Sequence, residues 1–265
     1  MLAFGGAAVL FAGGVRMGRD PAVPPAPPPG VDPAHWVGWD WTDVAMLLPG
    51  LVTASSLLAS IGLPLTDGVL GGASSGVRTA AESFTQQACF YGGALFNVWV
   101  LAGLRRGATL QQLGWRRFSW WWIPIAGVVA LGTLYVADSL QIAAQHLFPN
   151  AKNTQCQTVQ QDYSHFVVLA LIVVCVMAPL AEETIFRGFV YGWLNKVAPV
   201  GFAVVISGAI FGAAHLVLLL FIPLWAVGIV LALMYRSSNS LWPGALVHAL
   251  FNLPGIIAIL SASSC

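Results

Sequence analysis

Long apolar runs alternate with short polar stretches along most of the 265-residue chain. A helix that crosses a membrane needs about 20 consecutive residues of mainly apolar character. The first run, Leu2–Val15, is shorter, and we expect a short or tilted first span there. The later runs carry no formal charge and are Val44–Thr66, Ser83–Leu104, Phe118–Ala137, Phe166–Ala181, Val197–Tyr235 (long enough for two crossings) and Ser237–Cys265. The pattern predicts an all-α fold, a polytopic transmembrane bundle of about eight helices.

Changes in polarity divide the chain into four segments. Residues 1–43 hold the short first span and a proline-rich linker at Pro21–Gly30, and residues 44–140 hold the N-terminal transmembrane helices. Residues 141–165 form the most polar connection, which we interpret as an external loop. Residues 166–265 hold the core helices that carry the candidate chemistry. A proline-rich stretch is typical of a stiff linker rather than of a folded domain.

The composition agrees with a chain that is solvated mostly by lipid. Hydrophobic residues make up 58% of the sequence and charged residues 8%, against about 25% charged residues in soluble domains. These values exclude a disordered chain, a collagen and a disulfide-rich scaffold. The formal net charge of +1 gives no basic excess, so we expect membrane lipids as partners and no nucleic acid. Cys89 and Cys175 lie in apolar runs and are predicted to be buried thiols.

Basic residues mark alternate connections between the predicted spans. They follow the first span, separate the third from the fourth, follow the fifth, and separate the seventh from the eighth: Arg16, Arg19, Arg105, Arg106, Arg116, Arg117, Arg187, Lys196 and Arg236. Because basic loops are retained in the cytoplasm, we expect these connections to be cytoplasmic. Residues 141–165 and both termini are then external.

Two adjacent glutamates follow the fifth apolar run. The whole chain contains three Glu, and Glu182 and Glu183 are two of them. Ionisable groups at membrane depth are unfavourable and usually functional. Glu183 can pair with Arg187 at i,i+4, whereas Glu182 lies about 100° away around an α-helix and can face elsewhere. The alternative interpretation is that both acids lie at a hydrated helix end.

Three further polar residues interrupt the later spans. His215 is the one ionisable residue in its run, and His248 and Asn252 share a helix face at i,i+4. With Glu182, they lie about 10 to 24 Å from cytoplasmic helix ends at 1.5 Å per residue, so three helices could bring them into one pocket. The structural alternatives are a packing role for His215 and an interhelical hydrogen bond for His248 and Asn252. Pairs of small residues that allow close helix packing lie nearby: Gly188 with Gly192, and Gly208 with Gly212.

Three short motifs in this region resemble those of a known family. EETIFRG (Glu182–Gly188), FGAAH (Phe211–His215) and HALFN (His248–Asn252) are similar to the motifs EExxxR, FxxxH and HxxxN. In this order they are the signature of the CAAX prenyl protease and bacteriocin-processing (CPBP) intramembrane proteases, which include type II CAAX endopeptidases. The resemblance covers about residues 160–260 and implies an eight-helix core. It also implies hydrolysis of a peptide bond in a membrane-associated protein or peptide.

The resemblance also implies roles for the motif residues. Glu182 would be the general base, with His215 helping to hold and activate the water. His248 and Asn252 would donate to the oxyanion, and the remaining motif residues, Glu183, Arg187 and Phe211, would support them. This is a glutamic-type mechanism without a metal cofactor. The rival is a metalloprotease in which Glu182, His215 and His248 bind zinc, although the common zinc-protease motif HExxH is absent from the sequence.

Two functions of other classes stay open. The chain could be a non-proteolytic membrane scaffold or immunity-type protein of the same fold, or a proton-coupled transporter, because acids and histidines within spans also form proton relays. A transporter is typically built from repeated halves, and no such repeat is visible. Nothing in the sequence indicates recognition of a prenyl group. We expect a multi-pass protein of a bacterial cytoplasmic membrane.

Overall fold

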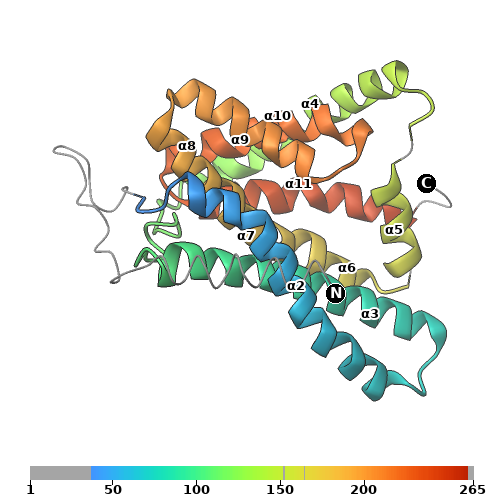
Figure 1. The fold of residues 1–265 in the computed structure, drawn as a ribbon. Coiled ribbons are helices and arrows are strands. Elements are labelled where there is room, and N and C mark those ends of the chain that lie inside the picture. The colour runs from blue at the N-terminus through green and yellow to red at the C-terminus, as the bar shows by residue number, and fades with distance from the viewer. Residues whose placement is uncertain (1–36, 152, 164, 262–265) are drawn as a thin grey trace.

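The computed structural model describes residues 37–151, 153–163 and 165–261, and all regular secondary structure among them is helical. The described residues form eight continuous helices, some of which include π-helical segments. Figure 1 shows how they are arranged. In chain order they are α2 (Trp41–Leu70); α3 (Ser75–Val98) with η2 (Trp99–Leu104); α4 (Trp122–Leu147); α5 (Thr154–Tyr163); α6 (Val167–Ile172), η3 (Val173–Met177), α7 (Ala178–Glu182), η4 (Glu183–Tyr191) and α8 (Gly192–Val197) in one rod; α9 (Val200–Ala214); α10 (Leu218–Ser238); and α11 (Leu241–Ser261).

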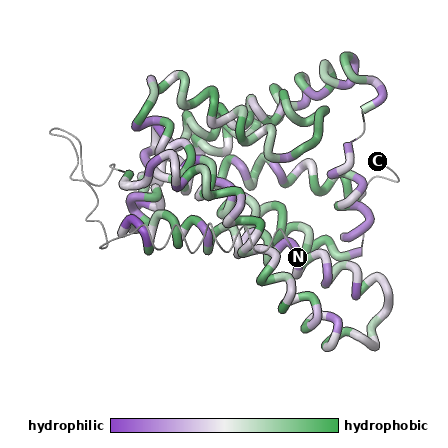
Figure 2. The backbone as a smooth tube through the Cα atoms, viewed as in Figure 1, coloured by the Kyte–Doolittle hydropathy of each residue, from purple (hydrophilic) through white to green (hydrophobic). Residues whose placement is uncertain are grey.

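The predicted all-α membrane fold is confirmed. Six of the described helices are long and apolar enough to cross a membrane, and α9 is a shorter apolar helix. These seven correspond to the second to eighth predicted spans. The predicted first span and the proline-rich linker lie outside the described residues. Figure 2 shows hydrophobic residues along the lengths of the helices and hydrophilic residues gathered towards both ends of the bundle. The protein is therefore an integral membrane protein.

The fifth predicted span is much longer than its apolar run suggests. The rod continues through both glutamates to Val197, and Glu183 and Arg187 are fully buried within it. The alternative of a hydrated helix end is therefore wrong, because the charged residues that end the apolar run lie in the middle of a buried helix. Glu183 and Arg187 lie against each other there, where no water is available to solvate their charges.

The polar segment 141–165 is more ordered than a simple loop. The end of α4 extends into it to Leu147, and α5 occupies Thr154–Tyr163. Helix α5 contacts α3, α6 and α11, so it lies against the ends of three helices (Figure 1). Tyr163 anchors this contact in a small apolar cluster with Ala170, Val173 and Ile256.

Close helix packing near the site depends on glycine, as the small-residue spacing predicts. A Cβ atom on Gly228 of α10 would lie 2.6 Å from the Cα of Gly208 on α9, and one on Gly212 would lie 2.7 Å from the carbonyl oxygen of Phe221. Only glycine permits this approach of two backbones. Helix α9 is therefore held directly against α10, which fixes the position of the residues at the end of α9.

Two non-helical segments, the loop between η2 and α4 and the stretch before α2, also pack against η4. The loop between η2 and α4 brings Leu113 so near that a Cβ on Gly188 would lie 2.5 Å from the Leu113 carbonyl oxygen, and Trp115 Nε1 donates to Thr184 Oγ1 at 3.0 Å. The stretch before α2 stacks Trp39 on Phe189, and Trp39 Nε1 donates to the Phe189 carbonyl oxygen at 2.8 Å. The π-helical segment is thus clamped by parts of the chain far away in the sequence.

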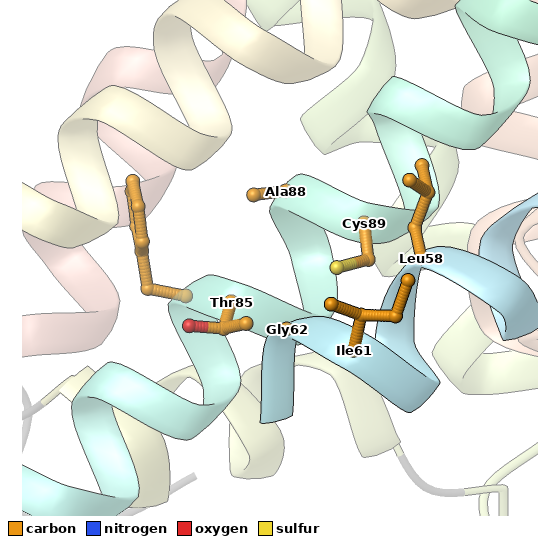
Figure 3. Close-up of a pocket in the computed structure, with 7 residues that line it drawn as sticks. Leu58, Ile61, Gly62, Thr85, Ala88 and Cys89 are labelled. Atoms are coloured by element: carbon orange, nitrogen blue, oxygen red, sulfur yellow. The ribbon is translucent and has the colours of Figure 1, made fainter. Parts of the chain in front are cut away.

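The hairpin of α2 and α3 forms one side of the bundle, and α2 packs mainly on α3. Behind the site the two helices are in close contact, since a Cβ on Gly93 would lie 2.6 Å from the backbone nitrogen of Ser55. Further along the hairpin, residues of both helices line an open apolar groove with a volume of about 420 Å³ (Figure 3). It is lined by Leu58, Ile61, Gly62, Phe84, Thr85, Ala88 and Cys89.

Candidate active site

The second glutamate of the first motif is paired with arginine, as its spacing predicts. Arg187 Nη1 lies 3.0 Å from Glu183 Oε1, and both side chains are fully buried. Arg187 Nη2 also donates to the Gly228 carbonyl oxygen on α10 at 3.2 Å. A buried charge is tolerated when an opposite charge lies beside it, so removal of either partner would leave the other uncompensated.

One histidine contacts both glutamates. His248 on α11 has its Nε2 atom 3.7 Å from Glu182 Oε2 and its Nδ1 atom 3.4 Å from Glu183 Oε1. Helical geometry alone predicts that the two carboxylates face different directions. They do so only in part, because the imidazole lies between them. The first and third motifs therefore meet at a single imidazole ring.

A glycine one turn before His248 lies close to Glu183. A Cβ atom on Gly244 would lie 3.1 Å from Glu183 Oε2, which is tighter than ordinary van der Waals contact. The sequence analysis does not identify Gly244, although its i,i+4 spacing to His248 is the signal that could have found it. The absence of a side chain there lets His248 reach the carboxylates.

Phe211 brings the three motifs together. Its ring is fully buried, and the Arg187 guanidinium carbon lies 4.4 Å from the ring centroid. The same ring makes edge contacts with His215 and His248, at centroid distances of 4.9 Å and 5.6 Å. A cation over the face and two imidazoles at the edge are both favourable for an aromatic ring. The ring of Phe211 therefore contacts the arginine of the first motif and a histidine of each of the other two motifs.

His215 lies at the C-terminal end of α9, where the helix stops. Its Nδ1 atom lies 2.9 Å from the Phe211 carbonyl oxygen. A carbonyl oxygen can only accept, so this nitrogen carries a proton, and in the neutral imidazole Nε2 has a free lone pair. The next residue, Leu216, has a φ of 55°, which turns the chain away from the helix axis. The short α9 thus ends in a histidine whose Nε2 can accept a hydrogen bond.

Asn252 makes a hydrogen bond to the backbone carbonyl of Val174 in the rod. This carbonyl has no backbone donor, because the residue that would supply the N–H is Pro179. In the π-helical segment η3, the Ala178 N–H donates five residues back to Val173, and Pro179 has no N–H to donate to Val174. Asn252 Nδ2 donates to that Val174 carbonyl oxygen at 2.8 Å. One of the two amide hydrogens of Asn252 therefore joins α11 to the rod.

Glu182 has one oxygen engaged and one without a hydrogen-bond partner. The hydroxyl of Tyr91 on α3 donates to Oε1 at 3.4 Å, whereas Oε2 makes no hydrogen bond within the described residues. The Glu182 side chain as a whole is 15% exposed, but its Oε2 atom is buried. Tyr91 belongs to no motif and lies 91 positions earlier in the chain, so sequence reasoning could not identify it.

Among the described residues, no group of three or more His, Cys, Asp or Glu side chains has an arrangement that could hold a metal ion. The two glutamates and His248 are in contact, but His215 is instead joined to the backbone of α9 and to Phe211. The thiols of Cys89 and Cys175 are free and partly buried.

Comparison with known proteins agrees with the motifs. Residues 164–254 match the family model described as type II CAAX prenyl endopeptidase Rce1-like, and this segment contains all three motifs. The chain is also 28% identical over 131 residues to "Putative membrane peptidase YdiL" of Bacillus subtilis (strain 168). That alignment covers 49% of this chain and 52% of the relative, so the chain spans about half the length of the curated relative that it matches. No solved structure matches the chain. The resemblance predicted from the three motifs is confirmed over the segment that carries them.

Proposed function

We propose that this chain is an intramembrane endopeptidase that hydrolyses a peptide bond in a membrane-associated protein or peptide. The observation that carries the proposal is the partly buried carboxylate of Glu182. One of its oxygens, Oε2, is buried without a hydrogen-bond partner among the described residues and lies 3.7 Å from Nε2 of His248, which belongs to the third motif. An unoccupied carboxylate oxygen at such a place is able to accept a proton from water. We further propose a bacterial cytoplasmic membrane as its location.

Glu182 and His215 would activate the water. A general base must present a lone pair to the proton that it removes, and such a base contributes about 10²- to 10⁴-fold to the rate. Oε2 of Glu182 has that lone pair free, and so does Nε2 of a neutral His215. The water would lie between them, with its oxygen directed at the scissile carbonyl carbon. No nucleophilic serine or cysteine is required.

His248 and Asn252 would stabilise the tetrahedral oxyanion. A His248 ring that carries both protons would donate from Nε2, while its Nδ1 hydrogen faces Glu183. Asn252 would use the amide hydrogen that Val174 does not take. When the carbon–nitrogen bond breaks, the proton removed from water passes from Glu182 to the leaving amine. Glu183, Arg187 and Phe211 would hold these groups in place without contact with the substrate.

We propose that this chemistry needs no metal cofactor. In the rival mechanism zinc would supply a Lewis acid and an activated water, and its ligands would be Glu182, His215 and His248. The contacts of His215 with the α9 backbone and with Phe211 support the metal-free version, since they give its ring a position without a metal.

The test compares purified wild type and Glu182→Gln in liposomes that contain a panel of internally quenched fluorescent transmembrane peptides. A matched control is Glu82→Gln, which removes the third glutamate of the chain, on the exposed side of α3 beside Arg78. We expect cleavage by wild type and by the control, and none by Glu182→Gln. A well-folded wild type that binds peptides without cleaving any of them would favour the scaffold. Peptide-independent proton uptake would favour the transporter.

A further inference from the structure

The hydroxyl of Tyr91 on α3 donates a hydrogen bond to the carboxylate of Glu182. The hydroxyl oxygen lies 3.4 Å from Oε1, across 91 positions of sequence. This separation is long for an O–H···O hydrogen bond, which is typically about 2.7 Å, but catalytic hydrogen bonds are often long before substrate binds. The contact comes from the N-terminal half of the chain, outside the segment that matches the family model.

The position of Tyr91 is fixed from two sides. Its ring packs against the apolar cluster that contains Tyr163, Val173 and Ile256, which belong to α5, η3 and α11. Two residues further along α3, Gly93 lies directly against the backbone of Ser55 on α2. A tyrosine ring held in this way has little rotamer freedom, so its hydroxyl points in a fixed direction.

The two oxygens of Glu182 therefore have different surroundings. Oε1 receives the hydroxyl of Tyr91, and Oε2 lies 3.7 Å from His248 Nε2 without a hydrogen bond among the described residues. A glutamate side chain has three rotatable bonds, and loss of one hydrogen bond would let its carboxylate rotate away from a productive orientation. A displacement of about 1 Å at a reacting group can reduce a rate by about 10²-fold.

We propose that Tyr91 is a positioning residue for Glu182, an inference that rests on the function proposed above. Its hydroxyl holds Oε1, so that Oε2 is presented to the attacking water. Tyr91 itself contacts neither the water nor the scissile bond. The α2–α3 hairpin thereby takes part in catalysis through α3, although all three motifs lie on other helices.

The experiment uses Tyr91→Phe, which removes the hydroxyl and keeps the ring. The matched control is Tyr163→Phe, because Tyr163 is also a buried tyrosine and its hydroxyl has no hydrogen-bond partner within the described residues. Both are assayed in liposomes on the peptide of the panel that wild type cleaves fastest. We expect Tyr91→Phe to lower kcat by about 10- to 100-fold, as for loss of a hydrogen bond to a charged group, with KM unchanged. Tyr163→Phe should keep both constants.

A second variant separates the hydroxyl from the ring. Tyr91→Met removes both, and we expect its kcat to be at least as low as that of Tyr91→Phe, with each rate normalised to the folded protein recovered by gel filtration. The proposal is overturned if Tyr91→Phe keeps the wild-type kcat, if Tyr163→Phe loses as much, or if only KM changes. Absence of cleavage by wild type would overturn the proposed function, and this inference with it.

Discussion

Oε1 of Glu183 lies 3.4 Å from Nδ1 of His248. The same oxygen is 3.0 Å from Arg187 Nη1. Neither contact has the geometry of a hydrogen bond, so both are electrostatic. A carboxylate beside one imidazole nitrogen favours a proton there and thereby determines how the other nitrogen is presented to the site. Glu183 therefore connects the arginine of the first motif with the histidine of the third.

The two glutamates are predicted to respond differently to loss of charge. Glu182→Gln should abolish turnover while the protein still folds and inserts, because it removes a base worth about 10²- to 10⁴-fold in rate. His215→Ala should resemble it. Glu183→Gln should lower folded yield or rate but leave measurable cleavage, because Glu183 acts through Arg187 and His248. The measurement is the single-turnover rate of peptide cleavage in liposomes.

This comparison needs proteins of equal folded yield and equal thermal stability. Replacing Glu183 leaves the fully buried Arg187 without its counter-charge, which can destabilise a protein by about 3–5 kcal/mol and imitate a catalytic loss. The double variant Glu183→Gln/Arg187→Met removes both charges and controls for this effect. Robust cleavage by well-folded Glu182→Gln, with Glu183→Gln inactive, would mean that the base is Glu183.

Much of the fold follows from the sequence because lipid leaves few alternatives to helices. Seven described apolar helices coincide with predicted spans, and the Glu183–Arg187 pair follows from i,i+4 spacing alone. The lengths of the elements are less predictable. The rod that begins at Val167 continues past both glutamates, where Arg187 pairs with Glu183 and His248 contacts both carboxylates, and these contacts depend on tertiary structure.

The motif residues of the candidate site could be predicted, but not the groups that position them. Tyr91 reaches Glu182 only because α3 packs beside the rod, and no local pattern encodes that contact. The closeness of Gly244 to Glu183 likewise depends on how α11 approaches η4. Gly188 and Gly192 have the spacing of a helix–helix contact, yet they pack against Leu113 in a loop and Trp39 in the stretch before α2.

Membrane orientation gives a prediction that is independent of catalysis. Because basic connections remain in the cytoplasm, the loop with Arg105 and Arg116 should be internal and α5 external. Gln111→Cys and Gln157→Cys place thiols at exposed positions of these two segments. In intact cells an impermeant thiol reagent should label Gln157→Cys above the parent chain, and Gln111→Cys only after permeabilisation. The reverse pattern would invert the topology.

Activity is predicted to persist without divalent metal. Glu182 and His215 can activate water directly, and His215 has partners on α9 that fix its ring. Prolonged dialysis against EDTA should therefore leave most of the cleavage rate, measured on the same peptide before and after treatment. Complete loss of activity, restored by one equivalent of zinc, would instead support the metalloprotease mechanism.

Asn252 is predicted to have a structural and a catalytic role that can be measured separately. Asn252→Ala leaves the Val174 carbonyl oxygen without a donor, because Pro179 has no N–H to offer. An unsatisfied buried carbonyl should lower the free energy of unfolding by about 1–3 kcal/mol. If the second amide hydrogen donates to the oxyanion, kcat should also fall by about 10²- to 10³-fold.

The double variant Pro179→Ala/Asn252→Ala separates the two roles, since an alanine at position 179 returns a backbone N–H five residues after Val174. In a π-helical turn that N–H is placed to donate to the Val174 carbonyl oxygen. We expect the double variant to recover thermal stability relative to Asn252→Ala, while its kcat stays low because no oxyanion donor has been restored. Pro179→Ala alone should keep nearly normal activity, as Asn252 is then intact. Recovery of kcat together with stability would show that Asn252 acts only by joining α11 to the rod, and that the oxyanion is held by His248 without it.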